Sequence, residues 1–153
     1  MDAFWFNSYF LYGASKGNPG VSGAGGAIFF PGCLKFLSFS WGLGLMTNNQ
    51  AECYSLLMAI QLAKGKRFKS ILIFGDYEML VKTLNTEGIF NNSLLNVILQ
   101  RIKTNLKDFD SVESYHILRD LNKLADTLAN KGCLLPQGNL SIDEESNEFQ
   151  PIT

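Results

Sequence analysis

The sequence predicts one α/β domain, built on a mixed sheet of five strands with helices packed beside it. Three strand-like segments come first along the chain. The hydrophobic pattern changes to that of a helix near residue 51, and strands and helices alternate from there on. With 153 residues, 46% of them hydrophobic, the chain is long enough for one compact core and too short for two.

Apolar or alternating segments bounded by turn residues mark the strands. The first ends in a run rich in glycine and proline, residues 15–20. The third, residues 35–42, alternates large apolar residues with serines. The fourth, residues 70–74, is almost wholly apolar, as expected for a strand buried on both faces of a sheet. The five predicted strands span residues 3–12, 25–30, 35–42, 70–74 and 112–118.

Four segments have the pattern of helices. The first is long, strongly apolar and free of glycine and proline, which predicts a largely buried helix. The last is expected to take Asp120 as its N-cap and to stop at Gly132. The predicted helices span residues 51–64, 78–84, 94–106 and 120–131. The element order is therefore β-β-β-α-β-α-α-β-α, which indicates an antiparallel meander extended by parallel strands.

A change of composition near Pro136 divides the chain. Residues 136–153 hold four of the fourteen acidic residues and no lysine or arginine. We therefore expect a folded domain over residues 1–135 and an acidic, mostly disordered tail over residues 136–153. The first 135 residues carry 13 basic and 10 acidic side chains. This mild positive charge permits nucleic-acid binding without indicating it.

The sequence predicts neither membrane insertion nor secretion. No segment approaches the roughly 18–20 uninterrupted apolar residues that span a bilayer. The N-terminal segment has no basic region and no small-residue cleavage site, so a cytoplasmic or nuclear location is expected. The chain is also expected to be a monomer. The three cysteines, Cys33, Cys53 and Cys133, are odd in number and widely spaced. Their pattern predicts reduced thiols, without disulfides or a zinc site.

Three carboxylates are the candidates for chemistry. Asp76 follows the apolar strand at its C-terminal end, which is where ligands bind in open α/β sheets. Glu52 falls in the first turn of the long helix, and Asp126 falls on the polar side of the last helix. Each acid alone is most often a solvated charge. Composition and periodicity do not show whether the three converge.

Four short motifs resemble those of type 1 ribonuclease H, and they occur in that family's order over about residues 3–133. Residues 12–20, YGASKGNPG, resemble the opening motif DGxxxGNPG, and residues 47–52, TNNQAE, resemble the second motif. Gly75-Asp76 resembles the third, and the spacing of His116, Asn122 and Asp126 resembles the fourth. The branch suggested is that of retroelement-derived and short-loop ribonucleases H.

The resemblance implies a ribonuclease H-like fold and a reaction. Members of the family hydrolyse the RNA strand of an RNA–DNA hybrid with two Mg²⁺ ions, or Mn²⁺ in their place, held by four carboxylates. Carried over by motif, the metal ligands and catalytic acids would be Glu52, Asp76 and Asp126. His116 would assist proton movement or product release. The alternative for His116 is a partly buried histidine on a strand.

Two positions depart from the family pattern. Tyr12 stands where the family has a metal-binding aspartate, and a neutral phenol supplies no charge at neutral pH. We therefore expect weak or single-ion metal binding, and hydrolysis that is weak or absent. Tyr77 stands where the family usually has serine. It is either a surface aromatic or a residue that narrows the cleft.

The resemblance also implies a nucleic-acid surface. In the family, small and amide side chains of the first two motifs enter the minor groove and contact sugars and 2′-hydroxyl groups. The matching residues here are Ser15, Asn18, Asn48, Asn49 and Gln50. The alternative is that Asn18 and Asn48 only form turns. The densest basic cluster, residues 64–69, fits a solvated helix end better than a phosphate-binding surface.

Three functional hypotheses follow. The chain is an active ribonuclease H, an impaired relative that still binds hybrid or double-stranded nucleic acid, or a structural or protein-interaction domain derived from a retroelement ribonuclease H. The retained acids favour the first two hypotheses over the third, and Tyr12 favours the second over the first.

Overall fold

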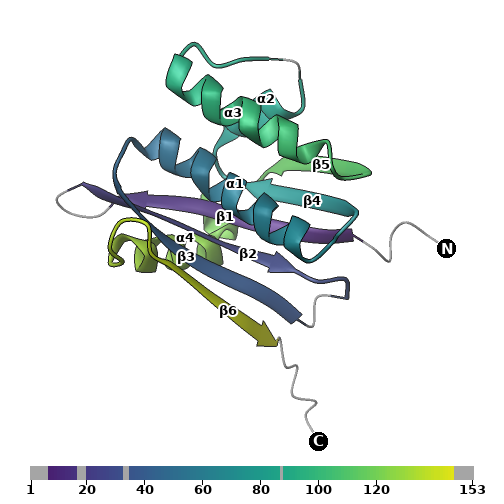
Figure 1. Ribbon diagram of the computed structural model, residues 1–153, viewed down its shortest axis with the longest axis horizontal. Coiled ribbons are helices and arrows are strands. Elements are labelled where there is room, and N and C mark those ends of the chain that lie inside the picture. Colours follow the sequence, from purple (N-terminus) through teal and green to yellow (C-terminus); the bar gives the residue numbers. More distant parts are fainter. Residues whose placement is uncertain (1–6, 17–19, 33–34, 87, 147–153) are drawn as a thin grey trace, which may run out of the picture.

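The computed structural model describes residues 7–16, 20–32, 35–86 and 88–146 of the chain. A sheet with the strand order β5-β4-β1-β2-β3-β6 forms its centre (Figure 1). The strands are β1 Asn7–Lys16, β2 Val21–Phe29, β3 Lys35–Leu45, β4 Ser70–Gly75, β5 Ser111–His116 and β6 Leu140–Ser146. β1, β2 and β3 form the predicted antiparallel meander, and β4 and β5 extend it in parallel from β1.

Helices cover both faces of this sheet. In the described part of the chain the α-helices are α1 Asn48–Gly65, α2 Glu78–Leu84, α3 Ser93–Leu106 and α4 Lys123–Cys133. α1 and α3 pack together in front of the sheet, and α4 lies behind it against β1, β2 and β3 (Figure 1). A single 3-10 turn, Arg119–Leu121, joins β5 to α4. The three layers confirm the predicted α/β class. Within the described residues, no helix is long and apolar enough to cross a membrane.

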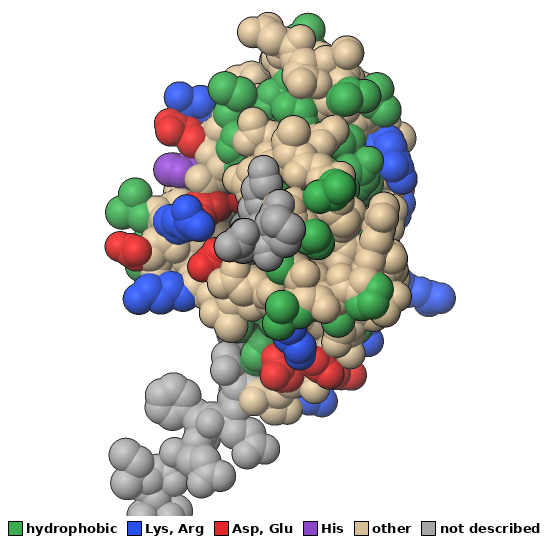
Figure 2. Space-filling view, turned by 90° about the vertical axis from the view of Figure 1, so that its left-hand side faces the viewer, with side chains coloured by type: hydrophobic (Ala, Val, Ile, Leu, Met, Phe, Trp, Pro, Cys, Tyr) green, Lys and Arg blue, Asp and Glu red, His purple; other side chains and the backbone are tan. Residues whose placement is uncertain are grey.

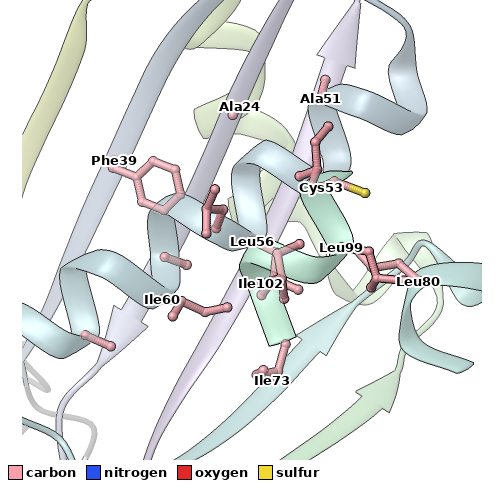
Figure 3. Packing of buried hydrophobic residues seen from close by; sticks show 14 of the residues in the cluster. Ala24, Phe39, Ala51, Cys53, Leu56, Ile60, Ile73, Leu80, Leu99 and Ile102 are labelled. Carbon is pink, nitrogen blue, oxygen red and sulfur yellow. The ribbon is translucent and has the colours of Figure 1, made fainter. Parts of the chain in front are cut away.

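The larger hydrophobic core lies between the sheet and α3, with α1 inside it. Leu56 and Ile60 of α1 are fully buried between Phe39 of the sheet and Ile102 of α3 (Figure 3). Because α1 has packed neighbours on two sides, its sequence is apolar over most of its circumference rather than along one stripe. This explains the long apolar segment without glycine or proline.

The second face of the sheet is shaped by small residues. A Cβ atom on Gly25 of β2 would overlap the backbone nitrogen of Ala129 and lie 2.7 Å from the Cβ of Leu128. A Cβ on Gly23 would lie 2.6 Å from the carbonyl carbon of Gly132. The buried Ser40 hydroxyl donates a 2.6 Å hydrogen bond to the carbonyl oxygen of Leu128. The glycines and serines of β2 and β3 therefore let the backbone of α4 approach the sheet closely.

The prediction of a disordered tail is wrong for residues 140–146. They form a sixth strand, β6, which pairs antiparallel with β3 and extends the predicted five-stranded sheet. A turn at Gly138, with φ of 87°, reverses the chain, and the amide of Gly138 donates to the carbonyl of Gly42. Acidic side chains are tolerated here because an edge strand needs only backbone pairing on one side. Residues 147–153 lie outside the described part.

The bounds predicted for the last helix are also corrected. Asp120 belongs to the 3-10 turn, and α4 begins at Lys123 after its N-cap residue Asn122. The helix passes through Gly132 instead of stopping there. A Cβ at Gly132 would lie 2.8 Å from the backbone oxygens of Ala24 and Trp41, so this glycine serves close packing. Residues 1–6, the predicted start of the first strand, lie outside the described residues.

Candidate functional site

Glu52 and Asp76 meet in one pocket. Asp76 directly follows Gly75, the last residue of β4, and Glu52 lies one turn into α1. Together with Asn48, Tyr77 and Arg119 they line a cavity of about 190 Å³. The Glu52 side chain is buried, whereas Asp76 is half-buried. The pocket lies at the C-terminal end of a parallel strand, where the sequence predicted a ligand site.

Backbone register brings the motif strands to the same level of the sheet. Gly75 of β4 pairs with Tyr12 of β1 on one side and with His116 of β5 on the other. The first, third and fourth motifs therefore meet across three adjacent parallel strands. Figure 2 views this end of the molecule and shows acidic, basic and histidine side chains gathered on one part of it. His116 is the last residue of β5, and its side chain is exposed. The alternative of a partly buried histidine on a strand is therefore wrong in its burial.

Asp126 is linked to the pocket through Arg119. The Nη2 atom of Arg119 lies 3.8 Å from Oδ1 of Asp126, in the first turn of α4. The Asp126 side chain is 39% exposed. Of the residues that line the pocket, Arg119 carries the only positive charge. Sequence reasoning missed it, because an arginine between a predicted strand and a predicted helix has no pattern that distinguishes it from a solvated charge.

The carboxylates do not form a preassembled metal centre. Within the described ranges, no three His, Cys, Asp or Glu side chains come together in a group that could hold a metal ion. Glu52 and Asp76 share the pocket, but Asp126 does not line it and lies 3.8 Å from the Arg119 guanidinium. This donor set does not fit the two-ion, four-carboxylate arrangement that the family resemblance implies. A role for Asp126 as a metal ligand stays a prediction.

The TNN segment divides between two structural roles. Asn48 lines the pocket and Asn49 is exposed beside it. The Gln50 side chain instead accepts a 3.0 Å hydrogen bond from the amide of Thr47, while the Thr47 hydroxyl accepts a 3.1 Å bond from the amide of Gln50. This capping box begins α1 and fixes the position of Glu52. Gln50 therefore has a structural role that the sequence interpretation did not include.

The first-loop residues are described only in part. Ser15 belongs to β1, where its backbone pairs with Gly23. Asn18 lies outside the described residues. Gly13, which follows Tyr12, places its Cα beside α4, since a Cβ there would lie 3.6 Å from Nδ2 of Asn122. The backbone of Tyr12 and Gly13 thus lies beside β4 and the start of α4.

Tyr77 lines the pocket and is half-buried, so it is more than a surface aromatic, and narrowing of the cleft stays a prediction. Its ring stacks on Phe90 with centroids 6.3 Å apart and an interplanar angle of 12°. Burial raises the pKa of the Tyr77 phenol, and the nearby Cys53 and Glu52 charges raise it further. The phenol therefore stays neutral at physiological pH, and its hydroxyl donates a weak hydrogen bond to Sδ of Met79 at 4.0 Å.

Cys53, next to Glu52, gives a prediction for alkaline pH. The thiol is fully buried, and burial together with the Glu52 charge raises its pKa from 9.0 to about 12. The folded state thus keeps a proton that the unfolded state loses above pH 9. We expect the free energy of unfolding to fall between pH 9 and pH 12, and to fall less steeply in Cys53→Ala. Urea unfolding at several pH values measures both slopes, and equal slopes would contradict the raised pKa.

Known proteins similar to this chain belong to the family that its fold and motifs indicate. The fold and the motif residues define a ribonuclease H-like α/β protein. The family described as "Reverse transcriptase-like" matches residues 11–132. The chain therefore belongs to this family of ribonuclease H proteins.

Individual relatives show the extent of the similarity. Ribonuclease HI of Halobacterium salinarum is 34% identical over 127 residues, which are 78% of this chain and 60% of that protein. A protein of Arabidopsis thaliana named as a ribonuclease H is 31% identical over 131 residues, covering 86% of this chain. The chain spans only 21% of that protein's length.

Solved structures share the fold. The crystal structure of ribonuclease H1 from Halobacterium salinarum has a TM-score of 0.73 at 30% identity, and the match covers 82% of this chain and 95% of that one. LC11-RNase H1, solved in complex with an RNA/DNA hybrid, has a TM-score of 0.71 at 24% identity, with 83% and 95% covered. The second likeness supports the fold alone.

Proposed function

We propose that this chain is a ribonuclease H domain that binds RNA–DNA hybrid and hydrolyses its RNA strand weakly or not at all. One observation carries the proposal: Glu52 and Asp76, from two different motifs, share a pocket with Asn48 at the end of a parallel strand. Two relatives, 31% and 34% identical to this chain, are named as ribonuclease H proteins, which supports an RNA–DNA hybrid as the class of ligand here.

Binding rests on the residues around the pocket. Asn48 and Asn49 present amide groups at the start of α1, beside the carboxylates. Amides donate and accept hydrogen bonds, so they suit sugars and 2′-hydroxyl groups in a minor groove. The opening motif also assigns sugar contacts to Ser15 and Asn18, and Asn18 lies outside the described residues. Gln50 contributes mainly by fixing α1.

Impaired hydrolysis rests on the acids. Tyr12 removes one expected carboxylate, and Asp126 is not among the residues that line the pocket. Glu52 and Asp76 are left as oxygen ligands for a single weakly held Mg²⁺ or Mn²⁺ ion. When bound, such an ion lowers the pKa of its water and stabilises negative charge on phosphate oxygens. His116 is exposed and level with Gly75 in the sheet, which supports the motif-based proposal that it assists proton movement or product release.

A combined cleavage and binding assay tests the proposal. We expect labelled RNA–DNA hybrid to bind, with affinity falling roughly 10- to 100-fold between 50 and 200 mM salt as a few phosphate contacts are screened. Cleavage with Mg²⁺ or Mn²⁺ should be close to that of a Glu52→Gln preparation, which controls for contaminating nuclease. Turnover comparable to an intact family member would contradict the impairment.

The second candidate is a non-catalytic structural or protein-interaction domain derived from a retroelement ribonuclease H. Exposed apolar side chains on α3, Leu94 and Val97, favour it. The same titration separates the two candidates, because a scaffold would show no salt-sensitive binding of hybrid.

A further inference from the structure

We infer that Arg119 binds a backbone phosphate at this pocket, so that hybrid binding does not require a divalent ion. The inference deepens the proposed function and rests on it. Three acids of the site, Glu52, Asp76 and Asp126, would repel a phosphate if no positive charge balanced them. Arg119 brings that charge into the pocket permanently.

The position of Arg119 is set by its backbone. Its carbonyl oxygen accepts a 3.0 Å hydrogen bond from the amide of Asn122, and the amide of Leu121 donates a 2.9 Å bond to Leu118. These bonds close the 3-10 turn directly before α4. The side chain therefore starts from a fixed point between the end of β5 and the first turn of α4, and from there it reaches the pocket wall.

The contact with Asp126 leaves N–H groups of the guanidinium available to donate hydrogen bonds to a phosphate. The 3.8 Å separation is longer than a hydrogen bond, and the Arg119 side chain is 77% exposed. Exposed ion pairs of this kind contribute little to stability. A guanidinium has five N–H donors in a planar fork that matches two phosphate oxygens. Asp126 can thus orient Arg119 from one side while a phosphate binds from the other.

The other basic cluster lies too far away for this role. Lys64 pairs with Asp108 at 2.6 Å, and Lys66 lies over the Phe30 ring at 5.7 Å. Both are at the C-terminal end of α1, whereas the pocket is at its N-terminal end. An α-helix rises about 1.5 Å per residue, so the two ends of this helix are roughly 25 Å apart.

The test measures binding of a fluorescent RNA–DNA hybrid by anisotropy, with Mg²⁺ or with EDTA. We expect the wild-type affinity in EDTA to stay within about two-fold of its value in Mg²⁺. Arg119→Gln should weaken binding in EDTA about 10-fold, as expected for losing one charge-assisted hydrogen-bonding group. It should also reduce the slope of log affinity against log salt by about one.

Arg67→Gln is the matched control. Arg67 is exposed and lies before β4, at the opposite end of that strand from Asp76, so the same loss of charge should leave affinity within about two-fold. Circular dichroism of both variants shows whether they fold. Unchanged affinity of Arg119→Gln, or wild-type binding that disappears in EDTA, would overturn the inference alone. Wild-type protein that binds no hybrid in either buffer would overturn the proposed function with it.

Discussion

Gly25→Ala is expected to destabilise the fold by about 3 kcal/mol, at the upper end of the usual cost of overpacking a core. The added Cβ would overlap the backbone of Ala129 and Leu128 in α4. Backbone atoms cannot move aside as the end of a side chain can, so α4 must shift away from β2. Intrinsic strand propensity predicts a small effect of opposite sign, because glycine is unfavourable in strands. The size and sign of the change therefore separate packing from propensity.

Gly65→Ala is the control for this substitution. It makes the same chemical change at the last residue of α1, where nothing lies within 4 Å of the added Cβ. We expect its stability to lie within about 1 kcal/mol of the wild type, on the stabilising side. Urea unfolding followed by circular dichroism measures both variants. Equal stability of the two variants would show that α4 does not pack on the glycine face as described.

The same glycines show where sequence reasoning about the fold succeeded and where it stopped. Long apolar periodic segments predicted α1, α3 and the first five strands to within a few residues over the described part. Gly132 was interpreted as a helix stop, but its small size serves tertiary contact with Ala24 and Trp41. Local patterns carry no information about such contacts, because the partner residues are about 90 to 110 positions away along the chain.

The sixth strand was missed for a related reason. Residues 140–146 are mostly acidic and polar, which is typical of disordered segments. Their order comes from backbone hydrogen bonds to β3, and Leu140 and Ile142 pair with Trp41 and Phe39 across the ladder. An edge strand can form these backbone hydrogen bonds although few of its own side chains are buried. Composition therefore underestimates the order of segments whose partner is already formed.

At the site, motif spacing predicted more than periodicity did. The family motifs placed Glu52 and Asp76 together, and the pocket supports this. Arg119 was not predicted, because its position depends on the 3-10 turn that separates β5 from α4. The predicted continuous helix from residue 120 would have placed this segment differently. Charge balance at a site is thus harder to predict than the positions of its acids.

Tyr12→Asp is expected to raise the rate of hydrolysis of the RNA strand by roughly 10- to 100-fold. Losing a residue that only supports a metal ligand already lowers metal affinity or activity by a factor in this range. Residue 12 pairs with Gly75 directly before Asp76, so its backbone already has the register of the motif. A carboxylate there restores one negative charge and two oxygen ligands for a hard divalent ion. The measurement is cleavage of labelled hybrid with Mg²⁺ and with Mn²⁺, together with Mn²⁺ affinity by calorimetry.

Tyr12→Asn separates the charge from the loss of the ring. Asparagine has nearly the size of aspartate and no negative charge, so it should neither raise hydrolysis nor tighten Mn²⁺ binding. Equal gains from both variants would mean that the phenol obstructs the site and that the missing charge is secondary. Tighter Mn²⁺ binding by Tyr12→Asp without any gain in cleavage would point to Asp126, because its pairing with Arg119 would then be what limits the reaction. Combining Tyr12→Asp with Arg119→Gln distinguishes this case when cleavage is measured at saturating hybrid, which compensates for the weaker binding of Arg119→Gln. Releasing Asp126 from its partner should then raise the rate of cleavage further.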